Sequence, residues 1–534
     1  MSPDPRDGTV RGLPPPHWHQ VGQRTAAAFR LTPLRVWIAV ACSTLFSAVE
    51  AQTIKFEPGI ALRETWTNNV NLDPTSARKS DLVTEITPAF TFHEAGDHTK
   101  LDATVALPVL LYARTGAENN SFYPSVSALG DVSFFNKFLH VEGAVNISQE
   151  FFTPFGAQPV ALANATDNRY RATTYSVSPY IQGTTPNGIQ YEVRNNNVWT
   201  NLSGSPIATN NARYTEFLAK AGTSGEPRVG WNANYDYTTV HFNEQNSIKT
   251  QIFRVGPFYR VTPQLLVDVN AGYESNDYTL TSSSDFIYGI GFRWRPSERT
   301  DVLGRWEHRF FGSSYRFSFD HRTPLTVWNV QASRNITTYP QQIAQLGVGS
   351  NVSDLINTLF LSAYPDPAVR QQAVEQFIRD RGLPSTLAQP VALYGEQILL
   401  QQTQSASVGL VGARNSIFFS VFNTKSEPIS AAGNPLPPSI FSENDNTQTG
   451  GGVSWTNRLT PSVNLLVNVN AYRTVSNTLP NQSTKQGSAV ASVSYPFSAR
   501  TLGFVGVRYQ GLWSDTATEY NETAAFAGIS YSLR

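Results

Sequence analysis

From Ile54 to the C-terminus the sequence repeats one unit, in which apolar and polar residues alternate over a run and a short break separates this run from the next. In residues 463–472 the odd positions are Val, Leu or Ala, whereas Asn464, Asn468 and Asn470 occupy even positions. Successive side chains of a β-strand point to opposite faces, so a period of two predicts strands with one apolar and one polar face. Runs of roughly ten such residues, repeated along a chain, are typical of a transmembrane β-barrel.

The composition supports this interpretation. A soluble chain of 534 residues is expected to form several domains with Leu-, Ile- and Val-rich cores, and the sequence contains no such segments. Only 15% of the residues are charged and 12% are aromatic, which suits strands with one face in lipid and one in water. The formal net charge is zero and no basic patch with interleaved aromatic residues occurs, so we expect no nucleic-acid partner.

The N-terminal segment has the features of a Sec signal peptide. Arg30 and Arg35 precede an apolar run, Val36–Val49, and small residues stand where signal peptidase would cleave between Ala51 and Gln52. A membrane-anchoring helix is the alternative, but the run is shorter than the roughly 20 residues that span a bilayer. The predicted organisation is an N-terminal extension with signal peptide (1–51) followed by an outer-membrane β-barrel (52–534).

Residue types that carry catalysis or bind metals are scarce. The only cysteine, Cys42, lies in the predicted signal segment, so the mature chain would have no thiol for a disulfide, a metal site or a nucleophile. The six histidines of the predicted mature chain form no pair at the spacing of metal ligands, and no local motif places a serine beside a histidine. We therefore expect no metal, no cofactor and no enzymatic activity.

Short breaks alternate with longer ones, as they do when one end of a barrel carries tight turns and the other carries long loops. The longer connections, which would face outside, are Asn68–Asp81, Thr153–Arg169, Lys425–Asn446 and Val475–Lys485. The predicted tight, periplasmic turns are Gly96–Thr99, Asn136–Lys137, Thr185–Gly188, Ser224–Pro227, Thr262–Gln264, Pro296–Arg299, Arg322–Pro324, Ala413–Asn415, Thr460–Ser462 and Ser498–Arg500. This count predicts an all-β, antiparallel up-and-down barrel of about 22 strands, within a range of 20–24.

One segment, residues 339–401, breaks the alternation and has helical spacing instead. Asp366 and Pro367 are suited to begin a helix that Gly382 would end, and Ser353–Ala363 predicts another helix. Long insertions of this kind are usually functional or disordered. The insert emerges on the outer side, where it could fold into the lumen as a gate, cap the mouth, or form a structural excursion without a role in transport.

The alternation also predicts which charges face the lumen. Arginine on the lipid face at mid-bilayer costs about 2–4 kcal/mol, so charged residues should point inward. On three consecutive strands the predicted lipid-facing residues are Phe286, Tyr288, Ile290, Phe292 and Trp294, then Val302, Gly304, Trp306 and Phe310, then Tyr315, Phe317 and Phe319. The predicted lumen-facing residues, which we name the arginine strip, are Arg293, Arg295, Arg305, Glu307, Arg309, Arg316 and Asp320.

Two interpretations of the arginine strip remain open. Arginine binds carboxylates and phosphates through paired N–H donors, which suits recognition of an anionic or polar glycan. Alternatively, the arginines and acids form a cross-strand salt-bridge network that stiffens the barrel.

The last predicted strand, Thr523–Leu533, ends in a pattern of Gly528, Tyr531 and Leu533. This spacing resembles the C-terminal signal that the barrel-assembly machinery reads, although the chain ends in Leu-Arg in place of a terminal Phe. We therefore expect the barrel-assembly machinery and outer-membrane lipid to be partners of the protein.

Several segments of the chain carry a family resemblance: Glu57-Pro58-Gly59, Glu64 to Leu72, Ser80 to Pro88, Thr337 to Gln342, Tyr364 to Pro367 and Val411 to Ser416. They resemble the PEP-CTERM system-associated outer membrane protein family. The resemblance covers most of residues 52–534 and implies a Gram-negative outer-membrane barrel associated with exosortase-type sorting and exopolysaccharide loci. The resemblance brings no established binding residues.

We expect a porin-like channel or assembly component with a polar, Arg-lined lumen, and its partners would include exopolysaccharide or sorted surface proteins. The alternative is a non-conducting surface anchor or glycan-binding scaffold that acts through its outer loops.

Overall fold

A computed structural model describes the protein from residue 53 to residue 533, apart from 205–210, 243–246, 278–281, 346–351, 366–369, 371–372, 375, 379–386, 430–442 and 516. The predicted signal cleavage site, Ala51-Gln52, lies outside the described residues, as do Asp366, Pro367 and Gly382 of the insert.

The first strands are β1 (Thr53–Thr67), β2 (Asp81–Ala95), β3 (Thr99–Ala106), β4 (Val109–Tyr112), β5 (Ser121–Phe122), β6 (Ser125–Phe134), β7 (Leu139–Phe151), β8 (Arg169–Thr184), β9 (Ile189–Ser203), β10 (Ala212–Thr223), β11 (Val229–Phe242) and β12 (Ser247–Thr262). The others are β13 (Leu265–Asp277), β14 (Ser282–Ser297), β15 (Thr300–Arg309), β16 (Gly312–Arg322), β17 (Thr326–Thr338), β18 (Ile398–Val411), β19 (Asn415–Pro428), β20 (Asn446–Arg458), β21 (Asn464–Ser476), β22 (Ser483–Ser498), β23 (Thr501–Ser514) and β24 (Tyr520–Ser532). The helices are α2 (Gly116–Asn119), α3 (Tyr339–Gln345) and α4 (Val352–Phe360).

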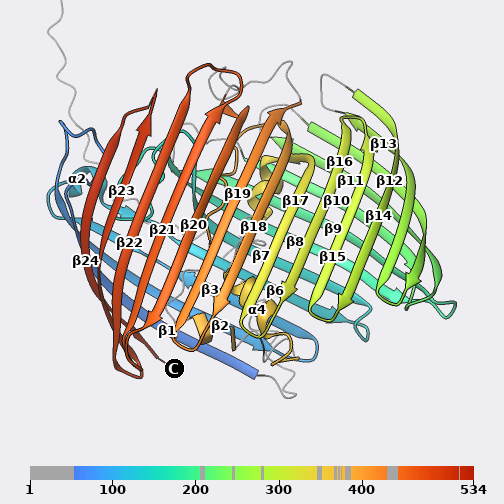
Figure 1. Ribbon diagram of the computed structural model, residues 1–534, viewed down its shortest axis with the longest axis horizontal. Coiled ribbons are helices and arrows are strands. Elements are labelled where there is room, and N and C mark those ends of the chain that lie inside the picture. Colours follow the sequence, from blue (N-terminus) through green and yellow to red (C-terminus); the bar gives the residue numbers. More distant parts are fainter. Residues whose placement is uncertain are drawn as a thin grey trace, which may run out of the picture. The chain divides into compact units, whose positions relative to one another are not determined.

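These segments form one closed antiparallel barrel of 22 strands (Figure 1). β3 and β4 both pair with β2 and act as a single interrupted strand. The next strand of the barrel is interrupted in the same way, because β6 pairs with β3 and β5 pairs with β4. The barrel closes where β1 pairs with β24 over Gly59–Thr67 and Ala524–Ser532. The predicted fold class and strand number are confirmed. Closure leaves every strand a partner on both sides, which the bilayer requires because it offers no hydrogen bonds to a free strand edge.

Each predicted tight turn joins two neighbouring strands. Gly188 and Gly225 adopt positive φ angles of 73° and 76° in two of these turns, which explains why glycine occurs there. The chain ends beside these turns, since the Ser532 N–H donates to the Arg500 carbonyl at 2.9 Å. The turns therefore mark one end of the barrel, the short-turn end, and the longer connections mark the other, the long-loop end.

The two faces of the wall have opposite character. The side chains of Phe286, Tyr288 and Ile290 are 71, 53 and 57% exposed, although they are large and apolar, whereas the opposite face of the same strand carries Ser283 and Asp285. An apolar outer surface and a polar lumen are the arrangement that a membrane-spanning barrel requires.

Phe310 does not face lipid as the sequence predicts. β15 ends at Arg309, and Phe310 lies in the following turn, where it packs on the lumen side against the buried cluster that contains Val240 and Ile248.

No helix among the described residues is long and apolar enough to cross a membrane. The insert instead folds inside the barrel. Ile356 and Leu355 of α4, which corresponds to the helix predicted at Ser353–Ala363, are buried in a cluster with Val327 of β17 and Phe418 of β19. Both wall residues face the lumen near the short-turn end, where Figure 1 shows α4.

The connection between β7 and β8 also differs from its prediction. The sequence places Thr153–Arg169 on the outside, but the 153–168 loop turns into the lumen. The backbone N–H groups of Gln158 and Val160 donate to the lumen-facing side chains of Gln486 and Gln510, at 3.1 and 3.2 Å. The loop joins β7 and β8 at the long-loop end, where the sequence places it, but its inward path was not predicted, because a loop without alternation has no sequence period that distinguishes a path over the rim from a path into the barrel.

Candidate functional site in the barrel lumen

The centre of the lumen-facing side of β14 carries no side chains. The space left there determines where the charged side chains of the neighbouring strands lie. Gly289 and Gly291 occupy the two central inward positions. A side chain at Gly289 would collide with the Trp306 carbonyl oxygen and would approach the Glu307 Cγ to 2.8 Å. Because β14 has no side chains here, those of β15 lie flat across it and reach β13 and β12.

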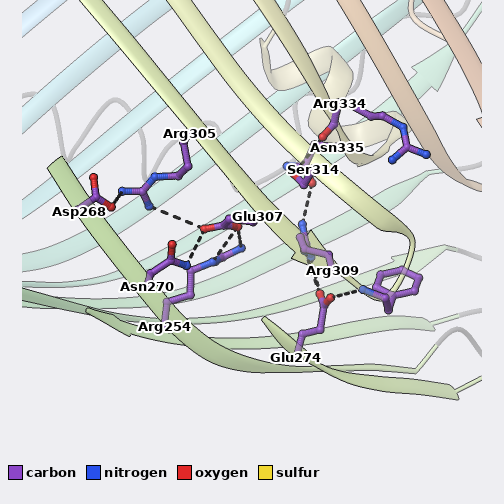
Figure 2. A network of polar contacts seen from close by, with 11 residues as sticks. Arg254, Asp268, Asn270, Glu274, Arg305, Glu307, Arg309, Ser314, Arg334 and Asn335 are labelled. Atoms are coloured by element: carbon purple, nitrogen blue, oxygen red, sulfur yellow. Dashed lines mark hydrogen bonds and ion pairs between the residues drawn. The ribbon is translucent and has the colours of Figure 1, made fainter. Parts of the chain in front are cut away.

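Six charged residues lie in or beside this space, and we name them the charged layer: Arg254, Asp268, Glu274, Arg305, Glu307 and Arg309 (Figure 2). At its centre, Glu307 Oε2 accepts two N–H bonds from Arg254, at 3.0 and 3.2 Å, and Oε1 accepts one from the Asn270 amide at 3.0 Å. Arg305 donates to Asp268 Oδ2 at 2.9 Å. The layer links β12, β13 and β15 by side-chain ion pairs that do not follow strand adjacency.

Arg309 is a structural member of the layer. It donates to Glu274 Oε2 at 2.6 and 3.1 Å and to the Asn335 amide oxygen at 2.7 Å, and the second Glu274 oxygen accepts the Phe310 N–H. The side chains of Arg309 and Glu274 are only 2 and 0% exposed. A solute in the lumen therefore cannot reach this pair, which fits the salt-bridge interpretation of the strip.

Arg293 and Arg295 lie apart from the charged layer, near the turn between β14 and β15. Both donate to Asp301, with Arg293 at 2.6 and 3.1 Å and Arg295 at 3.1 Å. About half of each arginine side chain is exposed. Asp320 of β16 accepts a hydrogen bond from the Asn329 amide at 2.7 Å.

Arg316 differs from the rest of the arginine strip. It lies directly opposite Arg305 in the register of β15 and β16, on the same lumen face, and it is exposed. Within the described residues no hydrogen bond or ion pair is assigned to it. Like charges at directly opposite positions repel each other, so this pair of guanidinium groups leaves uncompensated positive charge in the lumen.

The structure therefore divides the arginine strip. All seven predicted residues lie on lumen-facing positions, but they fall into separate groups: Arg305 and Glu307 share ion pairs with Asp268 and Arg254, whereas Arg309 pairs with Glu274 in a second group. Sequence reasoning missed Arg254, Asp268, Glu274 and Asp301. Arg254 stands between Phe253 and Val255, which are both exposed on the outer face, so the same alternation could have found it. Which acid neutralises which arginine depends on contacts across two or three strands, and no local pattern encodes these.

No group of His, Cys, Asp and Glu side chains in the described part of the chain is arranged to hold a metal ion.

A cavity of about 900 Å³ opens in the lumen next to the charged layer. Its wall is formed by β8 to β12 near their tight turns, with Arg305 contributing from β15. Side chains of Gln190, Lys220, Asn232 and Phe258 line it together with Arg305. The cavity therefore lies near the short-turn end and on strands other than β17 and β19, which carry α4.

At the long-loop end, three tyrosines hold the insert against the wall. The hydroxyls of Tyr170 on β8 and Tyr339 on α3 are 2.7 Å apart, and the Tyr394 ring contacts both of these tyrosines. Burial, with a contribution from Tyr170, raises the pKa of Tyr339 well above its ordinary value. The Tyr339 hydroxyl therefore stays protonated, and one of the two tyrosines always has a hydrogen to donate to the other.

The 153–168 loop has its own buried anchor. Glu522 accepts hydrogen bonds from Arg508 at 2.7 and 3.2 Å and from Thr67 at 2.7 Å. Asn164 joins this pair from the loop, because its amide oxygen accepts a bond from Arg508 at 2.9 Å. The loop is thus tied to lumen-facing residues on both sides of the seam between β24 and β1.

No family model and no curated protein matches the sequence. Among solved structures, the FrpB iron transporter from Neisseria meningitidis (F3-3 variant) is similar with a TM-score of 0.48 and 8% identity, over 89% of this chain and 81% of that chain. The siderophore receptor PirA from Acinetobacter baumannii gives 0.46 and 9%, over 91% and 81%. Pseudomonas aeruginosa OpdK, solved with vanillate, gives 0.33 and 9%, over 90% and 99%. These similarities concern the barrel alone.

Proposed function

We propose that the protein is a gated channel of the bacterial outer membrane, in which the insert is the gate. The observation that carries this proposal is the path of the insert along the lumen. It begins at the long-loop end, where Tyr339 contacts Tyr170, and α4 packs on Val327 and Phe418 near the other end. A segment that runs the length of a water-lined lumen is placed to control passage through it.

The contacts of α4 suit a movable element. Its apolar face is held by one cluster on β17 and β19, and Arg322 adds a long hydrogen bond to Ser362 at 3.4 Å. The rest of the lumen wall is dominated by Ser, Thr, Asn and Gln, which interact equally well with water. Displacement of α4 would therefore expose a limited apolar surface and open the lumen beside it.

The biological setting that we propose is a PEP-CTERM or exopolysaccharide-associated surface system, and the proposal rests on the sequence resemblance. The barrel-assembly machinery would insert the chain, and exopolysaccharide or sorted surface proteins would be the cargo or the partners. Deleting the gene in its host and measuring surface exopolysaccharide tests this setting. Unchanged amounts of polysaccharide and of sorted surface proteins would contradict it.

Single-channel recording in planar bilayers tests the gate. Ile356 is completely buried against the wall, so Ile356→Asn buries an amide without a partner and should release α4, at a cost of about 1–3 kcal/mol. We expect open events to become at least tenfold more frequent than in the unmodified chain. Leu361→Asn, at a side chain that is 37% exposed just beyond α4, is the matched control and should leave the open frequency unchanged.

A closed scaffold that binds glycans through its outer loops is the second candidate. The buried anchors of the 153–168 loop and of the insert favour it, because both segments are fixed within the lumen. Absence of conductance in the unmodified chain and in the Ile356→Asn variant, with both correctly folded, would decide for the scaffold.

A further inference from the structure

We propose that the cavity beside the charged layer is a binding site for carboxylate-bearing sugars, such as uronic acid units. This inference rests on the proposed function, because it names the class of solute that the channel would recognise. It is carried by three features of the cavity wall: uncompensated positive charge, a set of amide side chains with free hydrogen-bonding groups, and the lumen-facing ring of Phe258.

The positive charge comes from Lys220, Arg305 and the neighbouring Arg316. Lys220 faces the cavity from β10, is exposed, and has no assigned ion-pair partner among the described residues. Arg305 is engaged by Asp268 but keeps 39% of its side chain exposed, and Arg316 lies opposite it in register. These groups leave donors free to bind a carboxylate.

The acid in the cavity wall does not cancel this charge. Glu192 is already bound by Arg194, whose Nε donates to it at 2.9 Å. Lys137, another lysine in the wall, is paired with Asp97 at 2.8 Å. The remaining field in the cavity is therefore set by Lys220, with Arg316 opposite the Asp268-bound Arg305, and it favours an anion.

The amides indicate a polyhydroxyl partner and not a simple anion. Gln190, Asn232 and Asn234 line the cavity on adjacent strands, β9 and β11 flanking β10, and no side-chain hydrogen bond is assigned to them within the described residues. An amide offers both donors and acceptors, which matches the dual character of a sugar hydroxyl. Three such groups around one cation suit a ring that carries several hydroxyls and one carboxylate.

Phe258 supplies the apolar surface. Its ring faces the cavity from β12 and lies over Gly230, where any side chain would collide with it. Most lumen-facing positions of β9 to β11 near the cavity are polar, so this ring is a local exception. A flat ring beside hydrogen-bonding groups fits the C–H face of a sugar, and the volume of about 900 Å³ accommodates an oligosaccharide of a few units.

Isothermal titration calorimetry of the full chain in detergent tests the inference without requiring passage. The probes are trigalacturonate, the neutral galactotriose and acetate. We expect trigalacturonate to bind at least tenfold more tightly than either of the other two, because only it supplies both carboxylates and hydroxyls. Lys220→Gln should weaken trigalacturonate binding about tenfold and leave galactotriose binding unchanged.

The control is Lys249→Gln, which removes the same charge from an exposed position on the outer face of β12 and should bind trigalacturonate like the unmodified chain. Equal affinity for trigalacturonate and galactotriose, equal affinity for trigalacturonate and acetate, or unchanged binding in Lys220→Gln would each overturn the inference. A barrel that conducts but does not bind trigalacturonate contradicts only this inference, whereas one that binds but never conducts contradicts only the channel.

Discussion

Two salt bridges in this lumen show how burial decides what one residue contributes. Arg508 and Glu522 are 4 and 0% exposed, and their remaining hydrogen-bonding groups are satisfied by Asn164 and Thr67. Arg293 and Asp301 make a contact of 2.6 Å, close to the 2.7 Å between Arg508 and Glu522, but they are 47 and 33% exposed. Water screens the second pair, whereas loss of one partner in the first leaves a buried charge without compensation.

At this scale we expect Arg508→Leu to lower the free energy of unfolding by about 3–5 kcal/mol, because Glu522 would remain buried and unpaired. Arg293→Leu should lower it by less than about 1 kcal/mol. Urea unfolding in lipid vesicles, followed by tryptophan fluorescence, measures both. The explanation by burial would be wrong if the two variants lost equal stability.

At the scale of elements, the insert and the 153–168 loop are held by contacts at a few points. The insert meets the wall through the Tyr170–Tyr339 hydroxyl pair at one end and through α4 at the other. Phe152, next to the loop, packs against Tyr394 of the insert. The insert therefore contacts the wall at the point where the 153–168 loop leaves it, and release of the insert should loosen that end of the loop.

Tyr339→Phe tests whether the Tyr170–Tyr339 hydroxyl pair anchors the insert. It leaves the buried Tyr170 hydroxyl without its partner, at a cost of about 1–3 kcal/mol, whereas the double change Tyr170→Phe and Tyr339→Phe removes both polar groups and should be nearly neutral. We expect more frequent channel opening and faster proteolysis of the insert in the single variant, with most of the effect reversed in the double variant. Tyr364→Phe, at an exposed tyrosine, is the control. A double variant that opens as often as the single one would show that the hydroxyl pair is not the anchor.

At the scale of the whole molecule, the barrel inverts the usual distribution of side chains. The large apolar residues are exposed on the outside, and charged residues such as Glu274, Glu522 and Arg309 are buried on the inside. Lipid outside and water inside make this distribution stable. Position relative to the wall, more than burial alone, thus determines the effect of a substitution.

Ile290→Arg and Gln331→Arg test this directly. Ile290 lies on the outer face in the centre of β14, and Gln331 faces the lumen from β17. We expect Ile290→Arg to cost about 2–4 kcal/mol in a bilayer, and Gln331→Arg to have little effect because its charge stays in water. Unfolding titrations in vesicles measure both, and equal losses would contradict the assignment of the two faces.

Much of this architecture is determined locally. The side of the wall on which a side chain lies follows from a period of two, and the tight turns follow from Gly, Pro, Asn and Ser. The sequence alone therefore predicts the strand number, the tight turns and the lumen-facing position of every member of the arginine strip. The helix at Val352–Phe360 likewise follows from local spacing. Phe310 departs from its prediction because the strand ends one residue before it.

Only the tertiary structure decides how these charges are used and where the irregular segments go. The pairing of Arg305 with Asp268 depends on the space over Gly289 and Gly291, and the pairing of Arg309 with Glu274 likewise depends on contacts across non-adjacent strands. The path of the insert and of the 153–168 loop depends on surfaces that exist only after the barrel closes. Periodicity reports the neighbours of a residue along the chain, whereas these contacts join residues that closure of the barrel brings together.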